Sequence, residues 1–251
     1  MSLDILIATA GVFVGELYGN LIGGGSLVTQ IALQNILHFD IKTAMALDNS
    51  AVIGSNIGML IVLLRHHVVE WWFAVVIVFQ IIGAILGAWI LITIDPNILK
   101  VLFILAMIGL VTKNIFVKDS VQDSSGFKVS YRNISLLALA ALFIGMYNAA
   151  FVIGDWIIAL LILTSFFSIK YHNAIFLLTF SMFFSQPVAL YKYHAAGLID
   201  WSFLLPMMTA TIVGGVISAL VLNRIHSKKL ESFLKYLSIV LVVYLIFGLL
   251  G

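Results

Sequence analysis

The sequence predicts an all-α integral membrane protein with about eight membrane helices in two homologous halves, each opening with a broken helix. Three observations support this fold class. The chain is unusually apolar for its length, and its apolar runs are long enough to cross a bilayer. Its second half also repeats the spacing of polar residues and helix breaks found in the first.

The composition excludes a soluble globular domain. Of 251 residues, 63% are hydrophobic and only 10% are charged, whereas a soluble domain carries roughly 25% charged residues. The net charge of +2 comes from scattered basic residues, which gives no nucleic-acid footprint. The chain has no cysteine and no Walker motif, so we expect neither disulfides nor ATPase activity. Multiple membrane crossings predict a location in the plasma or inner membrane.

The apolar runs define the membrane elements in chain order. A helix needs ~20 apolar residues to cross a ~30 Å hydrocarbon core. The first stretch, 5–37, is long enough for more than one crossing but is interrupted at Gly23, Gly24 and Gly25. Helices are then expected over 43–64, 71–94 and 98–117. After a polar loop, the stretch 133–168 is interrupted at Gly154, and helices follow at 173–191, 201–223 and 233–250.

The polar segment 113–133 divides the chain nearly in half. We therefore expect a first membrane repeat over 1–117, a connecting loop over 118–132 and a second repeat over 133–251, forming one bundle. Shifting the chain by 130 residues places "IKTA" (41–44) on "YHNA" (171–174), Gly24 on Gly154, and Asn56 on Gln186. Duplicated halves with discontinuous helices are typical of secondary transporters.

The glycines before and at the first interruption predict different roles. Gly11, Gly15 and Gly19 are spaced by four, which places them on one helix face and favours close helix packing. Three consecutive glycines destabilise a helix by ~1 kcal/mol each, so Gly23, Gly24 and Gly25 are expected to end it.

A new helix is then expected over 27–37 with Ser26 as its N-cap. Its free N–H groups would offer an anion site inside the membrane. Gly154 and Trp156 would form the equivalent site in the second half.

Three carboxylates fall within predicted membrane elements: Glu16, Asp48 and Asp155. Placing an acidic side chain inside the membrane costs free energy, so such residues are functional candidates by default. We expect one of these three to bind a coupling proton. Plainer interpretations stay open. Asp155 can cap the helix starting at Trp156, Asp48 can lie at headgroup level, and a tilted first helix can bring Glu16 toward an interface.

A further polar set lies at matching depth in the two halves, and we expect it to line a cavity. Its members are Asn49, Ser50, Ser55 and Asn56 in the first half, and Thr179, Ser181, Ser185 and Gln186 in the second. Asn56 and Gln186 are expected to face each other across the axis between the halves. The alternative is ordinary hydrogen bonding between helices, worth ~0.6 kcal/mol per bond.

The order of these features resembles the TauE/SafE sulfite exporter family, which is grouped with toluene sulfonate uptake permeases. The first half matches through "GVFVGELYGNLIGGGSLV" and "KTAMALDNSAVIGSNIGMLIVLLRHHVVEWW", and the second through "IGDWIIALLIL", "YHNAIFLLTFSMFFSQPVAL" and "GLIDW". The resemblance spans essentially the whole chain. It implies proton-coupled secondary transport, commonly outward, of small sulfur-containing anions such as sulfite or organosulfonates. The chain departs from the family pattern in having Val28, Thr29 and Gln30 where Pro often follows the glycines, and Asp48 where Ser, Thr or Asn is common.

The sequence thus predicts a proton-linked exporter of small sulfur-containing or organic anions, with a small anion, a proton and membrane lipids as partners and no cofactor. Two alternatives remain: transport of a cationic or zwitterionic molecule held by the carboxylates, and a non-transporting membrane subunit or membrane enzyme. Whether the halves are parallel or inverted depends on whether each broken element crosses the membrane. A homodimer is also left open.

Overall fold

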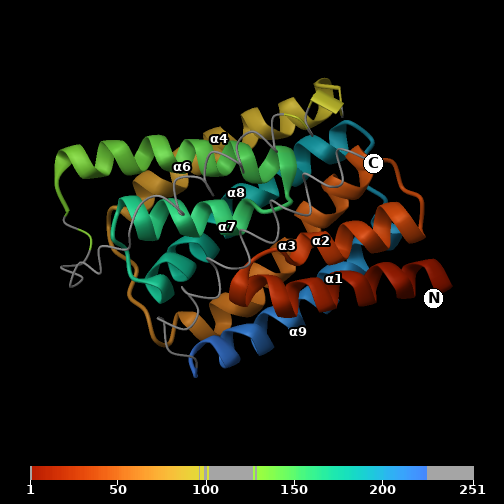
Figure 1. Cartoon of the computed structure of the whole chain (residues 1–251), viewed down its shortest axis with the longest axis horizontal. Helices are drawn as coiled ribbons and strands as arrows, with labels where there is room; N and C mark the ends of the chain where they lie inside the picture. The colour runs from red at the N-terminus through yellow and green to blue at the C-terminus, as the bar shows by residue number, and fades with distance from the viewer. Residues whose placement is uncertain (1, 96, 99–100, 102–126, 128, 225–251) are drawn as a thin grey trace.

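The computed structural model describes residues 2–95, 97–98, 101, 127 and 129–224. Within them the chain forms eight α-helices and two short π-helical segments (Figure 1). In order these are α1 (Leu3–Ile22), α2 (Gly25–Gln30), η1 (Ile31–Ile36), α3 (Ile41–Leu63), α4 (Phe73–Thr93), α6 (Tyr131–Phe151), α7 (Asp155–Leu161), η2 (Ile162–Phe166), α8 (Tyr171–Ala195) and α9 (Trp201–Leu222). The predicted helix at 233–250, most of that at 98–117 and most of the loop at 118–132 lie outside the described residues.

Five of these helices are long and apolar enough to cross a membrane: α3, α4, α6, α8 and α9. They coincide within a few residues with the apolar runs read from the sequence, which confirms a multi-pass helical protein. Side chains define several helix starts. Asp40 accepts hydrogen bonds from the N–H groups of Lys42 and Thr43 at the start of α3, and Asp200 accepts one from Ser202 at the start of α9.

The first membrane element is a helical hairpin. After α1 the chain turns at Gly23 and Gly24, both with positive φ, and α2 runs back along α1 (Figure 1). A Cβ added at Gly15 would lie 2.7 Å from the Gly25 carbonyl oxygen, and one at Gly19 would lie 2.8 Å from the Gly25 Cα. Gly11 lies against Ala32 in the same way. The close packing predicted for this glycine face is confirmed, and its partner is the returning segment.

Two details predicted for the second part of this broken element are corrected. The second helix begins at Gly25 rather than at residue 27, so Ser26 lies inside α2 and is not its N-cap. The α-helical geometry also stops at Gln30 and continues as η1 rather than as an α-helix to residue 37.

A similar succession of elements follows between residues 131 and 222. Helix α6 ends at Phe151, and Gly154 has a φ of +75°. Helix α7 begins at Asp155, with Gly154 as its N-cap and no side-chain cap. Asp155 is therefore the first residue of the helix rather than the residue that caps a helix starting at Trp156. The segments α7 and η2 lead into α8 and α9, as α2 and η1 lead into α3 and α4.

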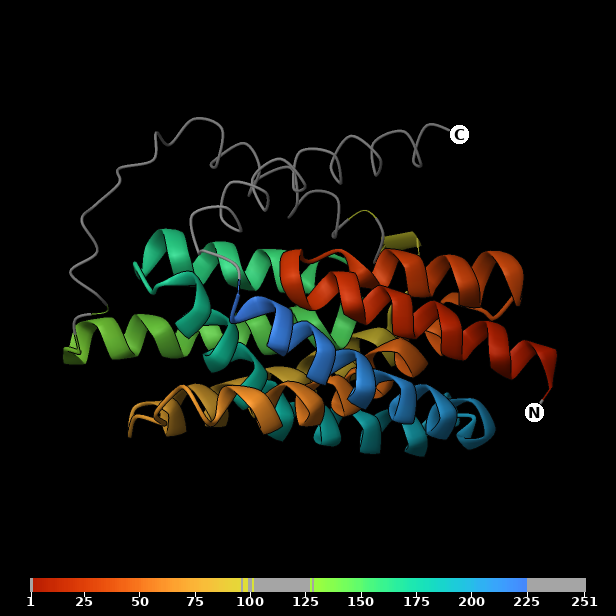
Figure 2. The same cartoon turned by 90° about the horizontal axis from the view of Figure 1, so that it is seen from below.

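Helix directions follow from their contacts. Gly54 and Gly58 of α3 lie against Met208 and Ile212 of α9 respectively, so these two helices run parallel. Helix α8 runs antiparallel to α3, because Asn56 bonds Gln186 while Met59, further along α3, lies beside Thr179, earlier in α8. Figures 1 and 2 show the long helices aligned along one common direction.

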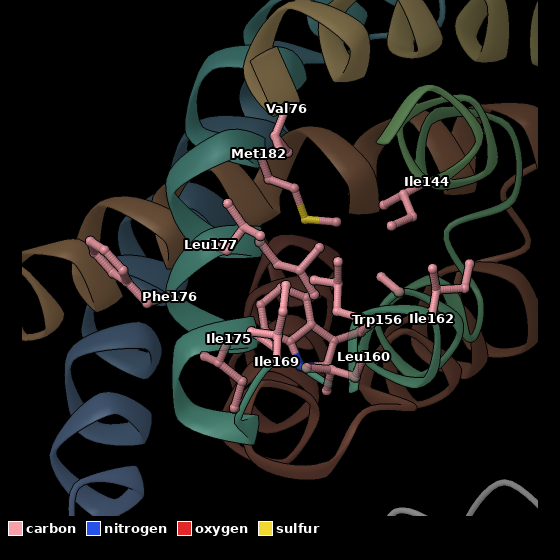
Figure 3. Packing of buried hydrophobic residues seen from close by; sticks show 14 of the residues in the cluster. Val76, Ile144, Trp156, Leu160, Ile162, Ile169, Ile175, Phe176, Leu177 and Met182 are labelled. Carbon is pink, nitrogen blue, oxygen red and sulfur yellow. The ribbon is translucent and has the colours of Figure 1, made fainter. Parts of the chain in front are cut away.

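The largest apolar cluster surrounds α7 and the first half of α8. Trp156, Leu160 and Ile162 pack there against Ile175 and Met182 of α8 (Figure 3). This cluster fixes the second short helix in the bundle interior.

Among the described residues, the two ends of the bundle differ in charge. The basic end, defined by Arg65, Arg132, Lys170 and Arg224, lies where α3 and α9 finish and where α6 and α8 begin, and it also carries Glu70. The acidic end, defined by Asp4, Asp40, Asp95 and Asp200, also carries Lys42 and Lys192.

Candidate functional site

Glu16 lies on α1, two turns before the turn at Gly23, and is only 5% exposed. Its carboxylate lies beside Asn20, one helical turn further on, and beside Ser55 of α3. Asn20 donates a hydrogen bond of 2.8 Å to the Ser55 hydroxyl. Glu16 is therefore buried among polar groups between helices.

Asp48 lies on α3 and is completely buried. Gln30, the last residue of α2, donates a 2.9 Å hydrogen bond to its Oδ2 and a 3.3 Å bond to the Ala44 carbonyl oxygen. Gln34 in turn donates to the Gln30 side-chain oxygen at 2.5 Å. The other carboxylate oxygen, Asp48 Oδ1, is buried without a partner among the described residues. The returning hairpin segment thus holds this carboxylate through Gln30, and Ser26 of the same segment also lies beside it.

Asp155 is the first residue of α7 and is partly buried. The Asn148 side chain of α6 donates a short hydrogen bond to its Oδ2. Asn49 of α3 donates in turn to the Asn148 backbone oxygen at 3.0 Å and to its side-chain oxygen at 3.2 Å. Adjacent residues of α3, Asp48 and Asn49, therefore connect to the first and the second interruption.

The three carboxylates influence one another electrostatically. Asp155 acts on both Glu16 and Asp48, and Glu16 acts on Asp48. In the described part of the chain, no basic side chain acts on any of the three. Nor are three His, Asp or Glu side chains of that part grouped closely enough to hold a metal ion. The structure thus gathers the predicted acids into one polar region that carries only negative charge.

Asn56 and Gln186 face each other as predicted. The Asn56 amide donates a 2.6 Å hydrogen bond to the Gln186 side-chain oxygen where α3 crosses α8. Nearby, the Thr179 hydroxyl lies 3.8 Å from the Met59 sulfur. These contacts fit hydrogen bonding between helices, the alternative raised by the sequence. The Gln186 side-chain nitrogen is buried with no partner in the described ranges, so one donor of this pair is left unsatisfied.

The remaining predicted residues lie at the first turn, on α3 and at the start of α7. Gly23, Gly24, Gly25 and Ser26 form the first turn and the start of α2, where Gly23 packs against Ile157 of α7. Ser50 is fully buried, and its hydroxyl is unpaired within the described residues. Gly154 is the N-cap of α7 and Trp156 is its second residue, but the Trp156 side chain points into the apolar cluster (Figure 3). The indole ring is therefore a packing element.

Four amide side chains that the sequence did not single out as site residues complete the network: Asn20, Gln30, Gln34 and Asn148. Each lies in a membrane element made mostly of apolar residues, and that is the signal that could have identified them. A buried amide requires hydrogen-bond partners, so an isolated Asn or Gln in a membrane element indicates a nearby polar group.

A separate hollow of about 670 Å³ opens at the acidic end. It is lined by the loops before α3 and α9 and by the first turns of these helices, including Asp40, Thr43, Asp200 and Ser202. None of the three central carboxylates contributes to its wall.

Comparison with known protein families gives one result that covers nearly the whole chain. Residues 7–245 match the family described as Sulfite exporter TauE/SafE. No curated protein and no solved structure matches the chain. Apart from the first four residues of α1, the match spans the elements described above, including both interruptions and the three carboxylates. The chain therefore belongs to the TauE/SafE sulfite exporter family, a family of integral membrane transporters.

Proposed function

We propose that this protein is a proton-linked secondary transporter of a small sulfur-containing or organic anion, such as sulfite or an organosulfonate. The observation that carries the proposal is the position of Glu16, Asp48 and Asp155. They lie together beside two helix interruptions, without a basic partner among the described residues. Buried carboxylates in membrane transporters commonly carry protons, and discontinuous helices commonly form substrate sites.

We further propose that the chain consists of two homologous halves, 1–117 and 133–251, joined by 118–132 and inverted relative to each other. Helices α3 and α8 occupy corresponding places in the element order, and they cross antiparallel at Asn56 and Gln186. The hairpin formed by α1 and α2 supports the inversion, because a returning segment changes the number of crossings in each half.

In this proposal the anion lies between the first turn of α2, near Ser26, and the side chains of Asn49, Ser50 and Asn56. The corresponding positions of the second half, Gly154, Thr179 and Gln186, complete the wall. The backbone N–H groups at the start of α7 contribute together with those of α2.

Purified protein in liposomes should transport sulfite or an organosulfonate, and an imposed pH gradient should change the rate. Glu16→Gln should lose the gradient dependence, because a neutral amide cannot bind the proton. Glu70→Gln is the matched control, since Glu70 is exposed in the loop after α3 and contacts Trp72 rather than the site. Folded protein that moves none of these anions would refute the proposal.

The same carboxylates favour a second candidate, a transporter of a cationic or zwitterionic small molecule. A panel of anions, cations and zwitterions tested by thermal shift distinguishes the two, because a ligand stabilises the protein that binds it. Stabilisation by cations alone would favour the second candidate.

A further inference from the structure

Next to the carboxylates, the described residues leave mainly acceptors and hydroxyls without a hydrogen-bond partner. The amides of Gln30 and Asn148 already donate to Asp48 and Asp155. Buried atoms left without a partner in the described residues include the acceptors Asp48 Oδ1 and Asn49 Oδ1, the hydroxyls of Thr29 and Ser50, and one amide donor of the proposed wall, Gln186 Nε2. An anion requires donors around it, so beside the carboxylates the region offers an anion few contacts beyond hydroxyls, the Gln186 amide and helix N–H groups.

Protonation would change both the charge and the hydrogen-bonding capacity of this region. Within the part of the chain that the structure describes, the charged groups that act on Glu16 and Asp48 are each other and Asp155, and Asp155 also acts on the phenol of Tyr147. A proton on one of these carboxylates removes a negative charge in a low-dielectric setting. It also converts an acceptor into an O–H donor that can bond an anion.

We propose that the anion and the proton bind this site with positive cooperativity, so that the protein is a symporter that carries both in the same direction. This inference rests on the proposed function and determines its mode of coupling. Linkage makes the effect reciprocal: if protonation strengthens anion binding, the anion strengthens proton binding by the same factor. An antiporter would instead require the two to compete.

Symport has a consequence for direction. An inward proton gradient then drives the anion into the cell. Net export occurs only when the outward gradient of the anion exceeds that proton gradient.

Binding of methanesulfonate to the purified full-length protein tests the sign of the coupling. A sulfonate stays ionised across the range, so a pH effect reports on the protein and not on the ligand. Between about pH 8 and pH 5 its affinity should rise, by up to about tenfold per pH unit if one proton is taken up. Glu16→Gln should flatten this dependence, and Glu70→Gln should retain it.

Liposomes provide the transport arm of the same test. With methanesulfonate on both sides and the outside made acidic, symport should concentrate the anion inside, whereas antiport would expel it. Binding that weakens or stays constant as the pH falls, or outward transport under this gradient, would overturn symport while leaving an anion transporter intact. Folded protein that binds neither methanesulfonate nor sulfite at any pH would overturn the proposed function as well.

Discussion

Replacing Gly15 with alanine tests whether the hairpin of α1 and α2 depends on close backbone contact. The added Cβ would lie 2.7 Å from both the Gly25 carbonyl oxygen and the Thr29 hydroxyl. The backbone oxygen cannot move away without displacing α2. Such overpacking costs about 1–3 kcal/mol, against a gain of up to about 1 kcal/mol from the better helix propensity of alanine.

Gly214→Ala is the matched control. Gly214 also lies within a helix, α9, but its added Cβ would meet nothing closer than the Glu16 Cβ at 3.5 Å, an ordinary contact. The control keeps the propensity gain, so the two variants should differ by about 1–3 kcal/mol. At about 2–4 °C per kcal/mol this is roughly 2–12 °C in Tm.

Thermal unfolding of the purified protein in detergent, followed by circular dichroism, measures this difference. Thr29→Ala should restore only part of the stability lost in Gly15→Ala, because the contact with the backbone oxygen of Gly25 remains. If Gly15→Ala were as stable as Gly214→Ala, the packing of α2 on α1 described here would be wrong.

Three other predictions concern the helix crossing, the basic end and the orientation in the membrane. Asn56→Leu and Gln186→Leu should each lower the free energy of unfolding by about 1–3 kcal/mol, because each leaves the buried amide of the other residue unpaired. If the double mutant lost only the sum of the two single losses, the direct hydrogen bond between Asn56 and Gln186 would be contradicted. Burial lowers the pKa of His67, so between the two pKa values the unfolded chain binds a proton that the folded chain does not. The free energy of unfolding should therefore fall as the pH drops below the ordinary histidine pKa of about 6.5. His67→Phe, which can keep the stacking on Phe176, should reduce that loss in thermal unfolding, and an unchanged pH profile would count against it. The chain has no cysteine, so single cysteines introduced by His66→Cys and Ala196→Cys can report on the basic and the acidic end. The positive-inside rule predicts that the basic end faces the cytoplasm, so an impermeant maleimide added to cells should label position 196 alone. Labelling of position 66 alone would reverse this orientation.

The polar network is concentrated in the first half of the chain. Gln30 and Asp48 form its centre, and the residues 130 positions further on are Leu160 and Leu178, both members of the large apolar cluster. The two halves thus share an order of elements but differ in composition. The first supplies most of the polar groups, and the second supplies the apolar packing around α7 and α8.

The helix orientations were open in the sequence because its basic residues do not decide between parallel and inverted halves. That ambiguity came from not knowing whether the short segments cross the bundle. The structure shows α2 returning along α1, which places Arg65, Arg132, Lys170 and Arg224 at one end. The charge asymmetry emerges only once the helix directions are known.

Local chemistry explains why the sequence alone determined the membrane elements. Composition and run length establish which segments prefer lipid, and consecutive glycines establish where a helix must stop, because both effects act within a single stretch of chain. The partners of Glu16, Asp48 and Asp155 were decided by tertiary structure. Gln30 meets Asp48 across 18 residues and Asn49 meets Asn148 across 99, and no local property specifies contacts at that separation. Tertiary structure also decided the role of Trp156. Its position beside a helix start predicted a contact with a ligand, but its ring packs in the apolar cluster.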